Sequence, residues 1–561
     1  MPGYFSTLNT ALKSLQVQKK SLDVTGHNIA NANTEGYSRQ RAVHTAADPY
    51  TVVGMGMPTG AGQVGTGVKL EEISRVRDQF IDAQINGEKQ SLGYWDKRYQ
   101  GLHRIELIFN EPSDSSLGES MNQFWGSLQD LSNDPEDPAV RETVKQRALT
   151  LSDTFHSLDN QLTSYKNSLN DDVSTMVNEV NSYATRIADL NKQIVRVQGA
   201  GKKPNDLMDK RDLLFEEMNK LVNVQGRVDQ RGSLNISISG INMVSHSDTH
   251  LLNIERGPEG SYEDTVVFSR TGTEAIIEAG ELAGVLNIRD EEIPHYKDQL
   301  DTIASELIEN FNQVHRAGYD FNGEAGQDFF VGDDAFSIGV ATEISNDVNK
   351  IAAGSLLDEL GVIRINNFEM DSEEDFSYEI EVIENVMENE ENTFTYTIRE
   401  YGADGEESEV YTNTITYSQV NDENFFISLP EEFNSTMEFK IEGAGELSIT
   451  STRAAGDGDN AFRLADVING RKLMNDGKAT LLDYYKSTIS VVGVDGQRAN
   501  QMVDNQNVLV DQLNNHRISV SGVSLDEEMA NMIQYQQAYT AATRVITTID
   551  QMLDSLMGII R

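Results

Sequence analysis

Both ends of this 561-residue chain carry apolar residues at heptad spacing, a pattern that restricts its possible folds more than any other feature. Near the N-terminus the spacing alternates between three and four, with one lysine and one glycine: Phe5, Leu8, Leu12, Leu15, Lys19, Leu22, Gly26 and Ile29. The C-terminal stripe opens with Leu525, Met529 and Met532, shifts phase near Tyr535 and resumes through Tyr539, Ala542, Ile546, Ile549, Leu553, Leu556 and Ile560. A seam this narrow buries too little apolar area to stabilise an isolated helix, so each end requires a partner.

The charges of the two ends indicate that they pair with each other. Residues 1–45 carry five Lys and Arg against two acids, a net charge of +3, and residues 524–561 carry two Arg against five acids, a net charge of −3. Ser524 and Glu527 form a capping box that predicts the start of the last helix. Gly26 and the asparagines after it predict the end of the first helix. The simplest packing is one coiled bundle of both ends, and burial against other copies of the chain fits the two stripes equally well.

Between the ends, the middle of the chain has mainly helical patterns. Three–four spacing predicts a helix from Pro138 to Gly199, on the order of 70 Å or more long at about 1.5 Å per residue. The glycine-rich residues 49–68 predict a loop or an extended connector. Helices are predicted at three further places: residues 70–110, residues 206–222 and the segment after Pro294.

Alternating apolar residues predict strands in two regions. The first pattern is Leu234, Ile236 and Ile238, and the second comprises Phe376, Tyr378, Ile380, Val382 and then Phe394, Tyr396, Ile398. The predicted fold class is α+β, with terminal helices that pair as a coiled coil, an elongated helical middle domain and one or two β-rich insertion domains. The predicted domains are terminal coiled-coil segments at 1–48 and 520–561, a helical rod-like domain at 49–225, 285–340 and 461–519, a small β domain at 226–284 and an acidic β-rich domain at 341–460.

The composition excludes several classes of partner and site. The chain has 90 Asp and Glu against 45 Lys and Arg, and because nucleic acids and anionic membranes attract basic proteins, neither is an expected partner. There are no cysteines, which excludes disulfides, thiolate metal sites and cysteine nucleophiles. The N-terminus lacks the basic start and unbroken apolar stretch of a secretory signal, and no run of about 18 apolar residues predicts a transmembrane helix. We therefore expect any export from the cell to use no cleaved signal.

The motifs that could carry chemistry are incomplete. Residues 60–65 match G-x-G-x-x-G, but a strand-like segment follows where a dinucleotide site needs a helix. His246 and His250 lie four apart in a strand-and-turn context, where that spacing does not direct two rings at one metal. Two calcium-like acidic runs, beginning at Asp320 and Asp457, lack the glycine of the sixth loop position. We therefore expect no catalytic, cofactor-binding or metal site, and the chain is not predicted to be an enzyme.

Two terminal motifs resemble those of the flagellar axial proteins, the superfamily of rod, hook and hook-associated subunits. Residues 25–40, TGHNIANANTEGYSRQ, are similar to its signature N-N-I-A-N-x-x-T-x-G-[FY], with His27 in place of the first Asn. The tail, SGVSLDEE at 521–528 and YQQAY at 535–539, is similar to the C-terminal segment of the superfamily. The YSRQ continuation, this form of the tail and a length above that of rod proteins favour the hook-associated protein 1 family. Two further segments, NDLMDKRD at 205–212 and GYD at 318–320, resemble internal segments of that family.

The resemblance implies a structural subunit at the junction between flagellar hook and filament, on which the filament assembles. It implies self-assembly with identical subunits, and as partners the hook protein, a second hook–filament junction protein, an export chaperone and the flagellar export apparatus. It also implies secretion through the flagellar type III apparatus, terminal segments that order only on assembly, a variable outer domain at 341–460 and no cofactor. A hook or distal rod protein and a surface adhesin that uses the acidic β-rich region are the alternatives.

Combined with the terminal seams, the resemblance predicts an assembly interface at the two ends of the chain. The interface consists of Leu8, Leu12, Leu15, Leu22, Ile29, Asn28, Asn31, Gly36, Tyr37, Leu525, Met529, Met532, Tyr539, Ile546, Leu553 and Leu556.

Overall fold

The computed structural model divides the chain into two compact units. Unit 1 contains Met1–Gly101, Asn167–Asp290 and Gln497–Arg561, and unit 2 contains Leu102–Lys166 and Glu291–Gly496. Three helices contribute residues to both units: α2 (Gln79–Phe109), α4 (Pro138–Gly199) and α11 (Leu481–Ser521). The structure describes residues 2–48, 65–257, 264–355, 363–370, 376–385, 393–402, 407–416, 427–428, 435–441, 445–450, 457–471, 473–474 and 478–560.

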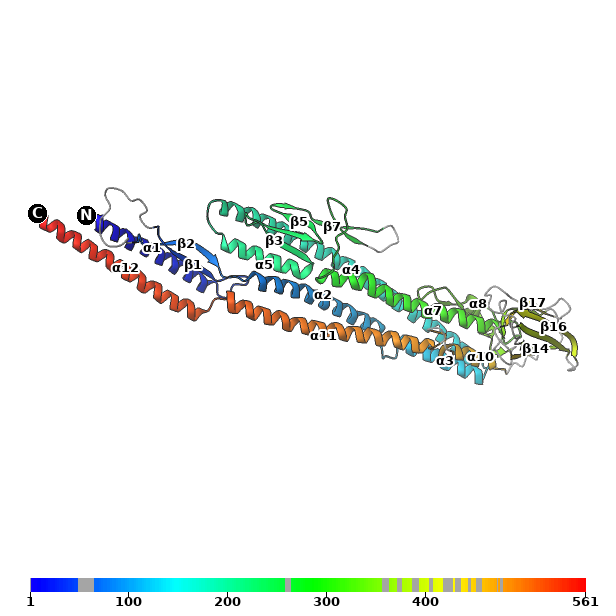
Figure 1. Cartoon of the computed structure of the whole chain (residues 1–561). Helices are drawn as coiled ribbons and strands as arrows, with labels where there is room; N and C mark the ends of the chain where they lie inside the picture. The colour runs from blue at the N-terminus through cyan, green and yellow to red at the C-terminus, as the bar shows by residue number, and fades with distance from the viewer. Residues whose placement is uncertain are drawn as a thin grey trace. The chain divides into compact units, whose positions relative to one another are not determined.

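The two ends of the chain form a pair of helices in unit 1. Helix α1 (Pro2–Ala30) and helix α12 (Leu525–Ile560) lie side by side, with both termini at the same end of the pair (Figure 1). The pairing is antiparallel, because Asn28 near the end of α1 contacts Glu528 near the start of α12. The predicted α+β class with paired terminal helices is confirmed.

Helix α1 continues past Gly26, so the end predicted there is wrong. The helix ends at Ala30, and the Nδ2 atom of Asn31 donates a hydrogen bond to the His27 carbonyl at 2.9 Å. A side chain thereby satisfies one of the carbonyls that every helix end leaves without an intrahelical donor. The turn then continues to Gly36, whose φ of 74° lies in the left-handed region that favours glycine.

A β-hairpin follows the first helix. Strand β1 (Gln40–Ala46) pairs antiparallel with β2 (Val68–Arg75), and both strands contact α1. The predicted helix at 70–110 is therefore wrong at its start, because pairing with β1 draws residues 70–75 into a strand and α2 begins only at Gln79. Most of the connector predicted at 49–68, including the first glycines of the G-x-G-x-x-G motif, lies outside the described residues.

The long helix predicted in the middle of the chain is confirmed at both ends. Helix α4 begins at Pro138, where the missing N–H of proline would have no intrahelical partner, and ends at Gly199. Helix α5 (Asn205–Leu221) follows Pro204 as predicted. A four-stranded antiparallel sheet and a hairpin come next: β3 (Val224–Val228), β4 (Leu234–Ile238), β5 (Ile241–Ser245) and β6 (Asp248–Thr249), then β7 (Leu252–Glu255) and β8 (Thr265–Phe268). The alternating residues of β4 are buried, which confirms that strand.

The helical region resumes at Glu281, before Pro294 and not after it as predicted. Helix α6 (Glu281–Asn287) and a π-helical turn (Ile288–Glu292) lead directly into α7 (Ile293–Arg316). The π turn interrupts the regular hydrogen-bond ladder just before the proline, which cannot donate to that ladder.

Unit 2 has an aromatic core between short helices. Helices α3 (Leu117–Asn133) and α7 both contact α10 (Asp459–Asn469). The ring centroid of Phe311 lies 5.4 Å from that of Phe124 and 5.0 Å from that of Phe329, and all three rings are fully buried. Short elements connect the helices: β9 (Gly318–Tyr319), β10 (Phe330–Val331), β11 (Gly339–Val340), α8 (Thr342–Asn346), a 3-10 turn (Val348–Lys350) and β12 (Gly354–Ser355).

The second predicted β region is also confirmed as antiparallel sheet. One sheet has the order β16–β15–β14–β19 and another the order β13–β18–β17. Ile380 faces Ile398 and Val382 faces Tyr396, and all four are buried, as the alternation predicted. The strands are β13 (Ile363–Met370), β14 (Phe376–Asn385), β15 (Thr393–Gly402), β16 (Glu407–Thr416), β17 (Ile427–Ser428), β18 (Ser435–Ile441) and β19 (Gly445–Thr450).

Candidate assembly interface

The buried face of α1 carries mostly small residues. Its buried positions are Ala11, Val17, Ser21, Val24, Thr25 and Asn28. The leucines and isoleucine that were predicted as the seam lie beside this face: Leu8, Leu15, Leu22 and Ile29 are half-buried, and Leu12 is 45% exposed. Among the described leucine and isoleucine side chains of this stripe, Leu12 is therefore the one that stays largely in contact with solvent.

Helix α12 presents one continuous heptad seam, without the phase shift predicted near Tyr535. The seam comprises Glu528, Met532, Tyr535, Tyr539, Ala542, Ile546, Ile549 and Leu553, all of them buried or half-buried. Its first position is a glutamate, which a search for apolar residues passes over, and this explains the apparent break. The side chain of Leu556 lies outside the described residues, as does that of Phe5 on α1.

A second apolar line on α12 stays exposed. Leu525, Met529 and Ile533 follow one another by one turn each and are 50%, 56% and 54% exposed; we call them the outer stripe. Two of these residues belong to the predicted interface, and the structure separates them from the seam that faces α1. The outer stripe is therefore an exposed apolar strip on one face of α12.

Asn28 connects the two terminal helices to strand β1. Its Nδ2 atom donates to Glu528 Oε2 at 3.0 Å and to the Gln40 carbonyl at 2.9 Å. Its Oδ1 atom accepts from the Gln40 N–H at 3.0 Å and from the Tyr37 hydroxyl at 2.7 Å. Asn28 is only 1% exposed, and its amide makes two hydrogen bonds as a donor and two as an acceptor. No other side chain of similar size combines two N–H donors with an oxygen that accepts two hydrogen bonds.

Tyr37 closes the turn that follows α1. Its hydroxyl lies 3.1 Å from His27 Nδ1, and the two rings meet edge to face. Burial is the largest cause that raises the pKa of Tyr37, and the negative charges of Asp206, Asp209 and Glu528 raise it further. The hydroxyl therefore stays protonated and donates to Asn28.

A Cβ atom at Gly36 would lie 3.1 Å from Leu213 of α5, so glycine allows this turn to approach the helix closely.

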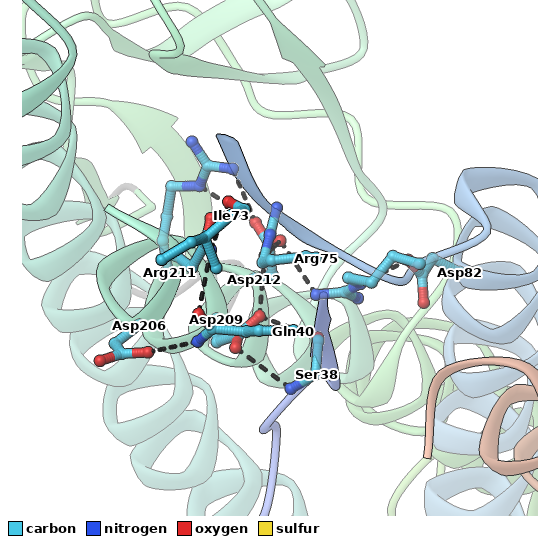
Figure 2. Close-up of polar contacts among 11 residues, drawn as sticks. Ser38, Gln40, Ile73, Arg75, Asp82, Asp206, Asp209, Arg211 and Asp212 are labelled. Carbon is cyan, nitrogen blue, oxygen red and sulfur yellow. Dashed lines mark hydrogen bonds and ion pairs between the residues drawn. The ribbon is translucent and has the colours of Figure 1, made fainter. Parts of the chain in front are cut away.

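The residues after the turn attach the terminal pair to α5. Ser38 donates through its N–H and its hydroxyl to the two oxygens of Asp209, at 3.1 and 2.8 Å. Gln40 Nε2 donates to Asp206 at 2.8 Å, and Gln40 Oε1 accepts from Asn205 at 3.1 Å. Figure 2 shows the contacts of Ser38 and Gln40 with Asp209 and Asp206 of α5.

Three arginines surround the acidic face of α5 in the same region. Arg75 NH1 lies 2.8 Å from Asp209 and 2.7 Å from Asp212, and Arg77 NH1 lies 2.9 Å from Asp212 (Figure 2). Arg211 binds the other oxygen of Asp212 at 2.8 Å. Burial alone would raise the pKa of Asp212, but the charges of Arg211, Arg75 and Arg77 outweigh it and hold the pKa below the usual aspartate range.

This lowered pKa predicts loss of stability in acid. Because the folded-state pKa of Asp212 lies below its unfolded-state value of about 4, its stabilising contribution is complete above that value and is lost as the pH falls through the folded-state pKa. We expect Asp212→Asn to lower the free energy of unfolding of unit 1 at pH 7 by on the order of 3 kcal/mol, because it removes one partner of a buried ion pair. The deficit should shrink at acidic pH, as measured by urea unfolding from pH 7 to pH 3.

Asp171→Asn, at an exposed position of α4, is the matched control and should leave the pH profile unchanged. A deficit of Asp212→Asn that stays constant over this pH range would contradict the assignment.

The sequence did not identify several residues of this site. Arg39, Glu528, Asp206 and Asp209 were absent from the predicted interface, although all four lie in segments singled out for their resemblance. Polar residues at these positions are consistent with exposed turns, so only the fold shows that they meet. Among the predicted residues, the structure brings together Asn28 and Tyr37, and it places Asn31 and Gly36 in the same turn.

The remaining motifs have structural partners. His246 lies in the turn between β5 and β6, 3.1 Å from Asp229. Asp320 Oδ1 accepts the N–H groups of Asn322 and Glu324, and Asp457 Oδ2 accepts from Tyr319 and Ser355. Among the described residues, no three His, Asp or Glu side chains are grouped so that they could hold a metal ion. Nor does any helix in the described part of the chain combine the length and apolar character needed to cross a membrane.

Three family models match the chain. Residues 102–330 match the flagellar hook-associated protein FlgK helical domain, residues 8–37 the flagella basal body rod protein and residues 515–559 the C-terminal segment of the flagellar basal body rod FlgEFG proteins. Flagellar hook-associated protein 1 of Bacillus subtilis is 28% identical over 100% of this chain and 99% of its own length. The Escherichia coli protein of the same name is 29% identical over 99% of this chain and 100% of its own length. The chain is similar to flagellar hook-associated protein 1 along essentially its whole length.

One solved structure is similar to this chain in its fold. The flagellar hook junction protein FlgK from Burkholderia pseudomallei has a TM-score of 0.60 and 16% identity, and the match covers 78% of this chain and 100% of that one. The two rod-protein matches cover most of α1 with the turn after it, and the end of α11 with most of α12, whereas the match to the hook-associated helical domain covers the middle of the chain. The polar site spans these regions, because Asn28, Tyr37 and Glu528 lie in the rod-like matches and the acidic residues of α5 lie in the hook-associated match.

Proposed function

We propose that this chain is the structural subunit that forms the junction between the hook and the filament of the bacterial flagellum, and on which the filament assembles. The observation that carries the proposal is similarity to flagellar hook-associated protein 1 along essentially the whole of both chains. The hook-associated helical domain, rather than a rod or hook domain, occupies the middle of the chain. The function is assembly, without catalysis.

The terminal pair supplies the physical mechanism of assembly. The pair packs the heptad seam of α12 against α1, while Leu12 and the outer stripe remain exposed. Burial of the outer stripe and of Leu12 against identical subunits would add buried apolar area, and this area stabilises the assembled state over the free subunit.

The partners follow from this place in the flagellum. They are identical subunits, the hook protein on one side and a second hook–filament junction protein on the other, with an export chaperone and the flagellar export apparatus before assembly. The protein is secreted through the flagellar type III apparatus and acts outside the cell. The absence of cysteine removes any disulfide that could obstruct passage of the unfolded chain through a narrow channel.

Electron microscopy of a strain that lacks this gene tests the function. We expect intact hooks without filaments, filament subunits in the culture medium, and restoration of filaments by the wild-type gene. Loss of the hook itself would instead assign the chain to the hook or rod. Normal filaments combined with loss of adhesion would assign it to surface binding.

A further inference from the structure

Arg39 contacts the chain on both sides of the break between helices α11 and α12. Its backbone N–H donates to the carbonyl of Ser521, the last residue of α11, at 3.0 Å. Its guanidinium binds the first turn of α12, with Nε 2.8 Å from Glu528 Oε1 and NH1 2.9 Å from Glu527 Oε2. One residue from the other end of the sequence thus bridges the break.

The break itself offers little to fix the angle between the helices. Only residues 522–524 separate α11 from α12, and each helix is capped locally. The N–H of Gly522 returns to the Ile518 carbonyl at 2.8 Å, and the Ser524 hydroxyl accepts the Glu527 N–H at 3.4 Å. These local bonds satisfy the helix ends without linking one helix to the other.

Arg39, in contrast, is held firmly on the body of unit 1. Its carbonyl accepts the N–H of Val76 at 2.8 Å, and its neighbours Ser38 and Gln40 are bonded to Asp209 and Asn28. The backbone of Arg39 therefore has a fixed position from which its side chain can hold α12. The Glu528 side chain is 3% exposed, so its charge requires this partner.

We propose that Arg39 is a positioning residue that sets the direction of α12 relative to α11, and with it the direction in which the terminal pair leaves the body. The proposal deepens the proposed function, because neighbouring subunits can bury the outer stripe only if α12 has a defined direction. Arginine suits the position because two separate nitrogens reach two carboxylates, whereas the single ammonium of lysine cannot reproduce both contacts.

Distance measurement between two spin labels tests this role directly. The chain has no cysteine, so Asn507→Cys on α11 and Gln537→Cys on α12, both exposed positions, can be labelled without further changes. In the purified full chain we expect one narrow distance distribution, which Arg39→Ala replaces with a broad one. Arg39→Lys should give an intermediate width, and Glu527→Gln, which alters only the exposed carboxylate, a smaller broadening.

Arg41→Ala is the matched control, since Arg41 is an exposed arginine two residues after Arg39 in the sequence, and it should leave the distribution narrow. Circular dichroism and the urea midpoint of each variant show whether the body is still folded. A broad distribution in the wild-type background, or a narrow one that Arg39→Ala and Glu527→Gln do not change, would overturn the proposal. Neither result depends on the deletion phenotype, so failure of the positioning role and failure of the proposed function can be told apart.

Discussion

Replacement of Asn28 by aspartate is expected to abolish assembly of the subunit. The new carboxylate would stand where Nδ2 now donates to Glu528 at 3.0 Å, and the Gln40 carbonyl would lose its donor. Two like charges in a buried site, together with an unsatisfied carbonyl, cost on the order of 3–5 kcal/mol. That cost corresponds to a decrease of about a hundred- to a thousand-fold or more in the population of the paired state.

The measurement is complementation of a strain that lacks the gene, read as motility in soft agar and as filaments seen by electron microscopy. The variant should appear in the culture medium, because export does not need the paired state, while the cells carry hooks without filaments. Asn33→Asp introduces the same change at an exposed position of the same turn and should restore motility. Wild-type motility of the Asn28→Asp strain would show that the contact with Glu528 is dispensable.

Charges on the outer stripe should block assembly without affecting the free subunit. The double variant Met529→Asp, Ile533→Asp replaces two side chains that are more than half exposed. The free energy of unfolding of the isolated chain should therefore change by no more than about 0.5 kcal/mol. If neighbouring subunits bury this stripe, as proposed, each buried carboxylate costs several kcal/mol and filaments should be lost. Complementation and electron microscopy give the result for the cell, and urea unfolding gives it for the isolated chain.

The control places the same two charges on another face of α12. Ala530→Asp with Gln534→Asp has the same spacing at exposed positions about 100° around the helix and removes no large apolar side chain. We expect this pair to assemble. Loss of filaments in both double variants would mean that added acid on α12, rather than burial of the outer stripe, prevents assembly.

Local patterns predicted the regular elements of this fold well. Pro138 and Gly199 bound α4 because proline and glycine act on the backbone itself, whatever the surroundings. The alternation of Leu234, Ile236 and Ile238 marked β4 because one face of that strand is buried. Residues 70–75 were misassigned because their conformation depends on pairing with β1, a contact that short-range spacing does not contain. The domain boundaries and the interface residues stay predictions.

The candidate site was only half visible in the sequence, for a physical reason. The periodicity of apolar residues reveals a buried helix seam, but a polar junction has no such pattern, because each of its residues is equally compatible with an exposed position. Asn28 and Tyr37 were singled out through a resemblance, and Glu528 was passed over because a carboxylate breaks an apolar stripe. Its burial depends on Arg39 and Asn28, which lie about 500 residues away in the chain.

Both termini lie at the same end of the α1–α12 pair, and this arrangement matters for anyone who labels the protein (Figure 1). A fluorescent or affinity tag on the N-terminus and one on the C-terminus would occupy the same neighbourhood, at the end of the pair farthest from Arg39 and Glu528. Neither position is a neutral alternative to the other.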